Sequence, residues 1–253
     1  MHTIASLKND LAAMGLHGRE TILVHSSMKS IGAVENRADG VLDALSEYFA
    51  DGLLVFPTLS YLYVNDRPGL NHFEVDSTPA CTGILPELFR KRPGVVRSLH
   101  PIHSLAALGK DAEAFTAGHE QFDTAFNRQG PFGRLFARQA QVLCIGVTLV
   151  RATCLHALEE WAQVPVLSAE PLHLFSTGKD GKTVPVKVHW HTGAHSEEFD
   201  RALPLLTETG AVKSCRFGDA PSLLLDCKKT EKILLPLLER NPDFFKPEKS
   251  LPF

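Results

Sequence analysis

The chain has 253 residues, of which 44% are hydrophobic and 22% charged, and its formal net charge is -3 at neutral pH. This composition is typical of a globular protein and argues against disorder or a fibrous repeat. The scattered basic residues give no electrostatic footprint for nucleic acid, and no apolar stretch approaches the roughly 20 residues that a membrane-spanning helix needs.

The first part of the chain alternates between helices and buried strands. Residues 4–14 place apolar side chains at helical spacing, and Gly15 follows as a stop. The apolar runs TILVHSS (21–27) and LLVFPTLS (53–60) predict strands, and residues 40–52 between them predict a helix. Two continuous apolar strands joined through a helix are typical of a parallel βαβ unit.

The same alternation continues through the middle of the chain. We predict a helix over TGILPELFRKRPG (82–94), a buried strand over HSLAALG (103–109), a helix starting at Pro131 and a third apolar strand over QVLCIGV (141–147). Thr153 is a suitable N-cap for the helix that follows. Ligands bind beyond the carboxyl ends of strands in open α/β sheets. The polar residues after these strands are therefore expected to converge on one crevice.

From about residue 170 the pattern becomes antiparallel. Residues 172–190 predict two alternating strands around the turn Asp180-Gly181. A helix capped by Ser196, strand material over 211–227 and a closing helix over 228–242 are predicted to follow.

These elements predict a single domain over residues 1–253 with an α/β fold. Residues 1–168 are expected to form a three-layer α/β/α core with a mostly parallel sheet. Residues 169–253 are expected to form a smaller antiparallel β-rich portion with C-terminal helices.

The N-terminus and the cysteines favour a cytoplasmic location. The first ten residues lack the basic and then apolar layout of a signal peptide. The five cysteines are odd in number and form no CxxC pair, which argues against a disulfide framework or a structural zinc site.

The most suggestive polar pattern is TCLHALEEW (153–161), which places His156 three residues before Glu159. Residues at this spacing are neighbours on a helix, so Glu159 can fix the tautomer of the imidazole. In the first turn the helix dipole disfavours the imidazolium, so His156 is expected to be neutral and able to accept a proton. A solvated helix face carries the same pattern, and the residues alone leave both interpretations open.

Other polar clusters are suited to binding. HSSMKSIG (25–32) offers hydroxyls, a lysine and a glycine that lets a ligand approach the backbone, although a serine-rich turn is an alternative. VVRSLHPIHS (95–104) contains an arginine suited to phosphate or carboxylate. His189 and His191 alternate on one predicted strand face, with His195 beyond. Nothing nearby clearly supplies a third ligand, so a solvated strand end is favoured and no metal is expected.

Taken in order, these stretches resemble the aminoglycoside 3-N-acetyltransferase family. The likeness covers nearly the whole chain and rests on VHSSMKSIG, LLVFPT, TPACTGILPELFRKRPGVVRSLHPIHSLAALG, TCLHALEE and RFGDAPSLLL. RSLHPIHS and the HxxE element are the most specific parts. The resemblance implies direct transfer of acetyl from acetyl-CoA to a primary amine of an aminoglycoside or a related amino sugar or metabolite. Its partners would be CoA and a small-molecule amine, and the chain would be a monomer or a homodimer.

The resemblance also implies roles for individual residues. His156 and Glu159 are the expected catalytic pair, with His156 as the general base. The expected CoA-binding and cleft residues are His25, Ser26, Ser27, Lys29, Ser30, Gly32, Thr58, Arg97, Ser98, His100 and Ser104.

The chain departs from the family pattern at two places. Val150 stands where an acidic residue is expected six positions before His156, and QGPFGRL stands where Gly-Ser-Pro is expected. Polycationic acceptors need carboxylates around them, so an amine-bearing metabolite is an alternative acceptor. An esterase or thioesterase that uses the same His-Glu pair, and a CoA-binding module without turnover, are alternative functions.

Overall fold

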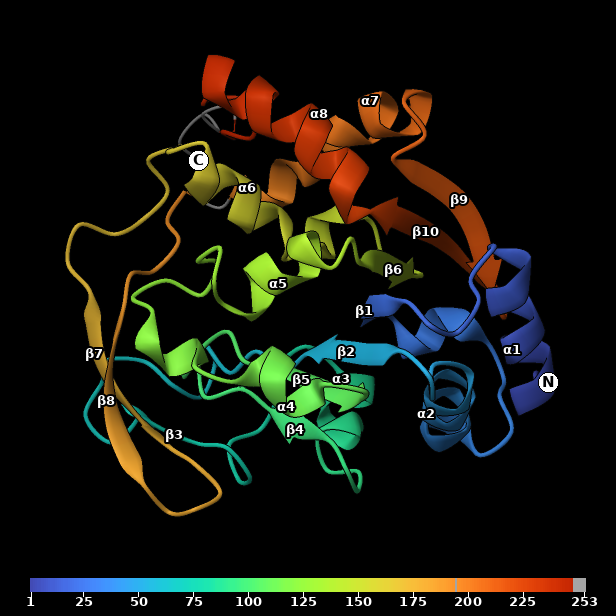
Figure 1. Ribbon diagram of the computed structural model, residues 1–253, viewed down its shortest axis with the longest axis horizontal. Coiled ribbons are helices and arrows are strands. Elements are labelled where there is room, and N and C mark those ends of the chain that lie inside the picture. Colours follow the sequence, from blue (N-terminus) through green and yellow to red (C-terminus); the bar gives the residue numbers. More distant parts are fainter. Residues whose placement is uncertain (194, 248–253) are drawn as a thin grey trace, which may run out of the picture.

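Two β-sheets organise the chain (Figure 1). The computed structural model describes residues 1–193 and 195–247. The larger sheet has seven strands in the order β4-β5-β2-β1-β6-β10-β9, and the smaller has three in the order β3-β7-β8. The strands of the large sheet are β1 (Thr21–Ser26), β2 (Leu53–Pro57), β4 (Val96–Arg97), β5 (Leu105–Gly109), β6 (Gln141–Ile145), β9 (Val212–Phe217) and β10 (Ala220–Asp226).

Helices cover both faces of the large sheet, as the three-layer prediction requires. Side chains of β1 alternate between the faces: Ile22 and Val24 pack with one apolar cluster, and Leu23 packs with the other. The first cluster contains residues of α1 (Ile4–Ala13), α2 (Arg37–Tyr48) and α3 (Ile84–Phe89). The second contains residues of α4 (Ala112–Thr116), α5 (Pro131–Ala137), α6 (Leu155–Trp161), α7 (Leu203–Glu208) and α8 (Cys227–Arg240). The predicted α/β fold class is confirmed.

The parallel part of the sheet lies at its centre. β1 pairs in parallel with β2 and with β6, and α2 connects β1 to β2, which confirms the predicted βαβ unit. The pairs β2-β5, β4-β5, β6-β10 and β9-β10 are antiparallel. Across the sheet, β4, β2, β1, β6 and β9 therefore run in one direction, and β5 and β10 in the other.

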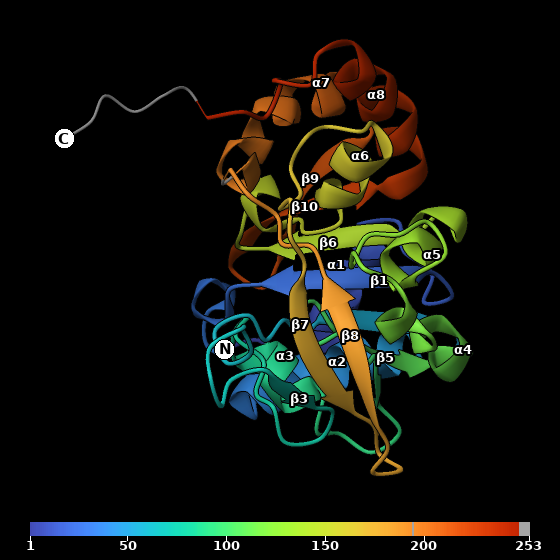
Figure 2. The ribbon, with the colours of Figure 1, turned by 90° about the vertical axis from the view of Figure 1, so that its left-hand side faces the viewer.

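The small sheet stands across one end of the large one (Figures 1 and 2). It joins β3 (His72–Glu74) to the predicted hairpin, β7 (Leu172–Thr177) and β8 (Thr183–Val188). Its apolar residues pack against Val64, which follows β2, and Ile102, which precedes β5. The hairpin is thereby fixed over loops that leave the large sheet.

The two sheets do not divide at residue 168. β9 and β10, from the C-terminal part of the chain, extend the large sheet, and β3, from the N-terminal part, belongs to the small one. The predicted separation into a core over 1–168 and an antiparallel portion over 169–253 is wrong in this respect. Alternating strands have the same sequence pattern whichever sheet they join.

Two predicted helix caps are also wrong. The N-cap residue of α6 is Cys154 and not Thr153. The backbone already turns before the helix, because Thr153 N–H donates to the Arg151 carbonyl (2.8 Å) and His156 N–H donates to the Thr153 carbonyl (3.2 Å). Ser196 lies inside a 3-10 helix, η4 (His195–Ala202), which precedes α7. In the described part of the chain, no helix is long and apolar enough to cross a membrane.

Candidate active site

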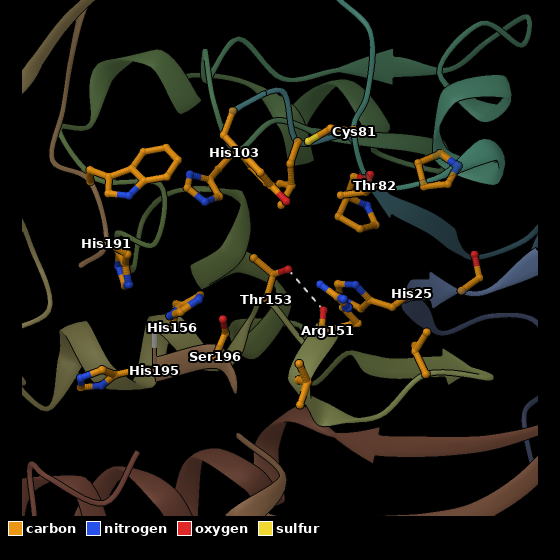
Figure 3. Close-up of a pocket in the computed structure, with 18 of the residues that line it drawn as sticks. His25, Cys81, Thr82, His103, Arg151, Thr153, His156, His191, His195 and Ser196 are labelled. Atoms are coloured by element: carbon orange, nitrogen blue, oxygen red, sulfur yellow. Dashed lines mark hydrogen bonds between the residues drawn. The ribbon is translucent and has the colours of Figure 1, made fainter. Parts of the chain in front are cut away.

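A cavity of about 430 Å³ lies at the carboxyl ends of β1 and β6 (Figure 3). The predicted convergence of polar residues beyond these strands is confirmed here. Loops from both halves of the chain form its wall: His25, Ser26, Pro57, Leu59, Tyr61, Cys81, Thr82, Pro86, His103, Val147, Val150, Arg151, Thr153, His156, Trp190, His191, Thr192, His195 and Ser196.

His156 and Glu159 are hydrogen-bonded neighbours on α6, as their spacing predicts. The Nδ1–H of His156 donates to Glu159 Oε2 over 2.7 Å. The Glu159 side chain is 0% exposed, whereas His156 borders the cavity. Because Nδ1 carries the proton in this bond, Nε2 keeps a free lone pair.

The other oxygen of Glu159 is also occupied. His195 Nδ1 lies 2.7 Å from Glu159 Oε1, so one buried carboxylate holds two imidazoles. Burial raises the pKa of Glu159, and the hydrogen bond from His195 opposes this shift.

His156 is neutral at pH 7. Burial lowers the pKa of this imidazole to about 4, against a contribution from Glu160 that raises it. The predicted neutral ring is thus present, but its main cause is loss of solvation, which the sequence pattern did not indicate.

A second carboxylate-imidazole pair lies beside the first. His191 Nε2 lies 2.6 Å from Glu160 Oε1, and the hydroxyl of Thr124 donates to the other oxygen of Glu160. The rings of His156 and His191 are 4.4 Å apart, in an edge-to-face arrangement. The expectation of a solvated strand end at His191 and His195 is therefore wrong, because both rings border the cavity.

His189, which alternates with His191 in the sequence, lies outside this group of cavity imidazoles. His189 Nδ1 instead donates to the Ser168 carbonyl over 2.7 Å. Ligand atoms of His156, Glu159 and His191 lie within 4.8 Å of one another, a spacing that a metal ion would accept. However, both oxygens of Glu159 already accept imidazole N–H groups, so hydrogen bonding alone explains this cluster.

Two residues of the predicted serine loop reach the cavity. Buried polar atoms in its wall, His25 Nε2 and Ser26 Oγ, have no hydrogen-bond partner among the described residues. Such atoms need a partner, and a ligand in the cavity would supply one. The remaining predicted loop residues, Ser27, Lys29, Ser30 and Gly32, lie in or beside the 3-10 turn η1 (Met28–Ile31) and outside the lining.

This turn is packed against Gly146, which follows β6. Gly146 has φ +62°, and a Cβ at this position would lie 2.3 Å from the Cβ of Ser30. Ser30 in turn donates a hydrogen bond to Ser27 Oγ (3.0 Å). Close packing of the two loops thus requires glycine here.

Gly146→Ala is expected to lower the free energy of unfolding by about 1–3 kcal/mol more than Gly69→Ala does. Gly69 has a similar φ of +80°, but its Cβ would meet nothing within 4 Å, so it controls for backbone strain alone. Urea unfolding of both variants measures the difference. Equal losses would mean that the contact with Ser30 is accommodated without cost.

Five of the predicted CoA-binding or cleft residues lie outside the cavity lining and are buried: Thr58, Arg97, Ser98, His100 and Ser104. The Arg97 guanidinium donates to the carbonyls of Thr58 (2.8 Å) and Thr78 (2.5 Å) and stacks on Phe73. These contacts give Arg97 a structural role, and its contact with the cofactor stays a prediction.

Several neutral histidines should make the fold sensitive to acid. Burial lowers the pKa values of His25 and His119 to about 3 and that of His156 to about 4, and it also lowers those of His100, His103 and His191. As the pH falls, the histidines of the unfolded chain bind protons before those of the folded protein do, and this favours unfolding. The contribution of the neutral rings to the free energy of unfolding is therefore complete above about pH 6.5 and is lost as the pH falls below it.

The free energy of unfolding is therefore expected to fall between pH 6.5 and pH 5, by about 1 kcal/mol per pH unit for each such ring. Urea denaturation across this range measures the slope. His119→Gln should reduce the slope, whereas His17→Gln, at an exposed position, should leave it unchanged. A flat profile in the unmodified protein would contradict the expectation.

The chain was compared with known proteins. Residues 23–239 match the family model described as aminoglycoside 3-N-acetyltransferase. Aminoglycoside N(3)-acetyltransferase VII of Streptomyces paromomycinus is 33% identical over 182 residues, which are 64% of this chain and 62% of that protein. The chain thus spans less than two thirds of that relative's length in the alignment.

Solved structures match over a longer range. The apoenzyme of aminoglycoside acetyltransferase AAC(3)-IVa has a TM-score of 0.82 and 28% identity, covering 98% of this chain and 92% of that one. The binary complex of AAC-IIIb with CoASH has a TM-score of 0.83 and 25% identity, covering 98% and 99% respectively.

Proposed function

The chain belongs to the aminoglycoside 3-N-acetyltransferase family, and on this premise we propose that it transfers acetyl from acetyl-CoA to a primary amine. The acceptor in this proposal is an aminoglycoside or a related amino sugar or metabolite. Residues 1–253 act as one domain. The observation that carries the proposal is the His156-Glu159 pair at a cavity whose wall holds unpartnered polar atoms.

His156 is the general base of the proposed reaction. The amine must be neutral to attack a thioester, because a protonated amine has no lone pair. Its nitrogen becomes positively charged as the C–N bond forms, so one proton must leave it at this step. Nε2 of His156 accepts this proton, and Glu159, bonded at Nδ1, stabilises the imidazolium. The tetrahedral intermediate then collapses and expels the CoA thiolate, which takes the proton from the imidazolium and leaves as the thiol. The acetylated amine and the neutral base remain.

The cosubstrate arm is proposed to lie against the end of β1. Ser26 Oγ and His25 Nε2 need hydrogen-bond partners, and the amide and thioester groups of acetyl-CoA would supply them. A donor from this wall would stabilise the developing oxyanion. Ser27, Lys29 and Ser30, in the turn that follows, would contact more distant parts of CoA.

Direct transfer in a ternary complex is favoured over an acetyl-cysteine intermediate. Cys81 is the cysteine in the cavity lining, and burial raises the pKa of its thiol. A thiol that resists ionisation is a poor nucleophile. Cys154 is buried and lies outside the lining.

The proposal is tested by measuring CoA-thiol release and product mass with acetyl-CoA, with and without an amine panel. The expected result is release that requires both substrates, with a product in which one acetyl group replaces one hydrogen of the amine. Thiol release without any amine would instead indicate a hydrolase. CoA binding by calorimetry without turnover on any amine would indicate a binding module.

A further inference from the structure

The cavity lacks accessible carboxylates. Among the described residues that line it there is no Asp or Glu. Glu159 and Glu160, which bond to histidines of the lining, have side chains 0% and 8% exposed, and their oxygens accept hydrogen bonds from imidazoles and from Thr124. An ammonium group in the cavity would therefore meet imidazole and hydroxyl groups first. A polycation would find few anionic partners here.

The charged side chain of the lining is cationic. Arg151 is exposed, and within residues 1–193 and 195–247 its guanidinium makes no hydrogen bond or ion pair. Figure 3 shows it beside His25, and its charge contributes to the lowered pKa of that ring. The histidines around it, including His103 and His156, have pKa values lowered by burial and are neutral at pH 7. Arg151 thus sets the sign of the charge at the accessible wall.

Arg151 and the proposed base, His156, line the same cavity. Arg151 ends η3 (Leu149–Arg151), and the backbone from there to His156 is tightly coiled by the bonds at Thr153. The phosphates of CoA lie roughly 15 Å from its sulfur, because the intervening arm is as long as four or five extended residues. When the thioester reacts at His156, the phosphates of CoA are therefore too far away to bind Arg151. An anionic group of the acceptor can bind Arg151 instead.

From these features we infer that the acceptor is an amine that also carries an anionic group, a carboxylate or a phosphate, which Arg151 binds. This inference rests on the proposed acetyl transfer and narrows its acceptor. Val150, the neighbour of Arg151 in the lining, is apolar and leaves the positive charge of Arg151 uncompensated. A guanidinium binds carboxylate and phosphate through paired N–H donors.

The test compares four acceptors: glucosamine, glucosamine 6-phosphate, muramic acid and gentamicin. The phosphate and carboxylate amino sugars are expected to exceed glucosamine in kcat/KM by roughly 10-fold, the effect of one charge-assisted hydrogen bond. Comparing glucosamine 6-phosphate with muramic acid shows whether Arg151 prefers a phosphate or a carboxylate. Gentamicin, a polycation, is expected to be the poorest substrate.

Arg151→Gln should remove the preference for the anionic acceptors through a higher KM, and Arg151→Glu should shift it toward gentamicin. Arg216→Gln, at an exposed position outside this cavity, is the matched control and should change nothing. A higher KM for acetyl-CoA alone in Arg151→Gln would assign Arg151 to the cosubstrate and overturn the inference. Best activity on gentamicin with no effect of Arg151→Gln would also overturn it, while leaving the acetyltransferase proposal intact.

Binding gives a readout that does not depend on turnover. Glucosamine 6-phosphate is titrated by calorimetry into the protein saturated with CoA, in the unmodified chain and in Arg151→Gln. The inference predicts about 10-fold weaker binding in the variant. Equal affinity, or no binding to either protein, would overturn it even if acetyl transfer to another amine is found.

Discussion

Replacing His156 by alanine is expected to lower kcat by about 100-fold or more, the usual contribution of a general base. The imidazole borders the cavity and keeps Nε2 free, while Glu159 holds Nδ1 at 2.7 Å. Since the proton is transferred during attack, the loss should appear in kcat, with smaller changes in the KM for acetyl-CoA. Steady-state kinetics with a saturating amine provide the measurement.

His173→Ala is the control for this experiment, because His173 is exposed on β7 and should tolerate the change. Urea unfolding of His156→Ala excludes a loss of activity through misfolding. A variant that folds normally and turns over at the original rate would show that another group removes the proton.

Arg97→Met is expected to lower the free energy of unfolding by about 3 kcal/mol or more, because it leaves several buried hydrogen-bond acceptors unsatisfied. The guanidinium also donates to the hydroxyl of Ser104 (3.0 Å) and connects the end of β2 to the segment before α3. Unfolding in urea, with two-state fits, measures this loss.

Arg92→Met is the matched control. Arg92 bonds to Asp39 and Asp43 at the surface with its side chain 21% exposed, and such pairs contribute about 0–1 kcal/mol. If Arg97→Met were no more destabilising than Arg92→Met but raised the KM for acetyl-CoA, Arg97 would belong to the cofactor site after all.

The periodicity of apolar residues predicted most elements but not how the outer strands pair. The run at 105–109 is buried and apolar, and this pattern is the same in a parallel and an antiparallel strand, so the direction of β5 was not readable. Which sheet β9 and β10 join depends on contacts between distant parts of the chain, such as the pairing of Leu225 with Val142. Local sequence patterns do not predict such contacts.

Individual contacts of the candidate site were predicted where residues lie close in sequence, and the convergence of strand ends on one cavity was predicted from the fold class. His156 and Glu159 are three residues apart, and helix geometry brings them together. Glu159 and His195 are separated by 36 residues, and their hydrogen bond forms only because the chain returns after β8. The three histidines over 189–195 were a signal that could have identified this part of the site. The sequence does not show which segments pack against them, so a solvated strand end was the favoured interpretation.

The pairing of β3 with β7 means that the wall of the cavity is completed late during synthesis of the chain. His72 and Phe175 are partners in that pair, so the loops bearing Tyr61 and Cys81 acquire their neighbours about a hundred residues after they are synthesised. Contacts of such long range form late and slowly. A nascent chain halted before the hairpin would carry His156 and Glu159 yet have no enclosed chamber for a thioester, so ligand capture should begin only when the hairpin has docked.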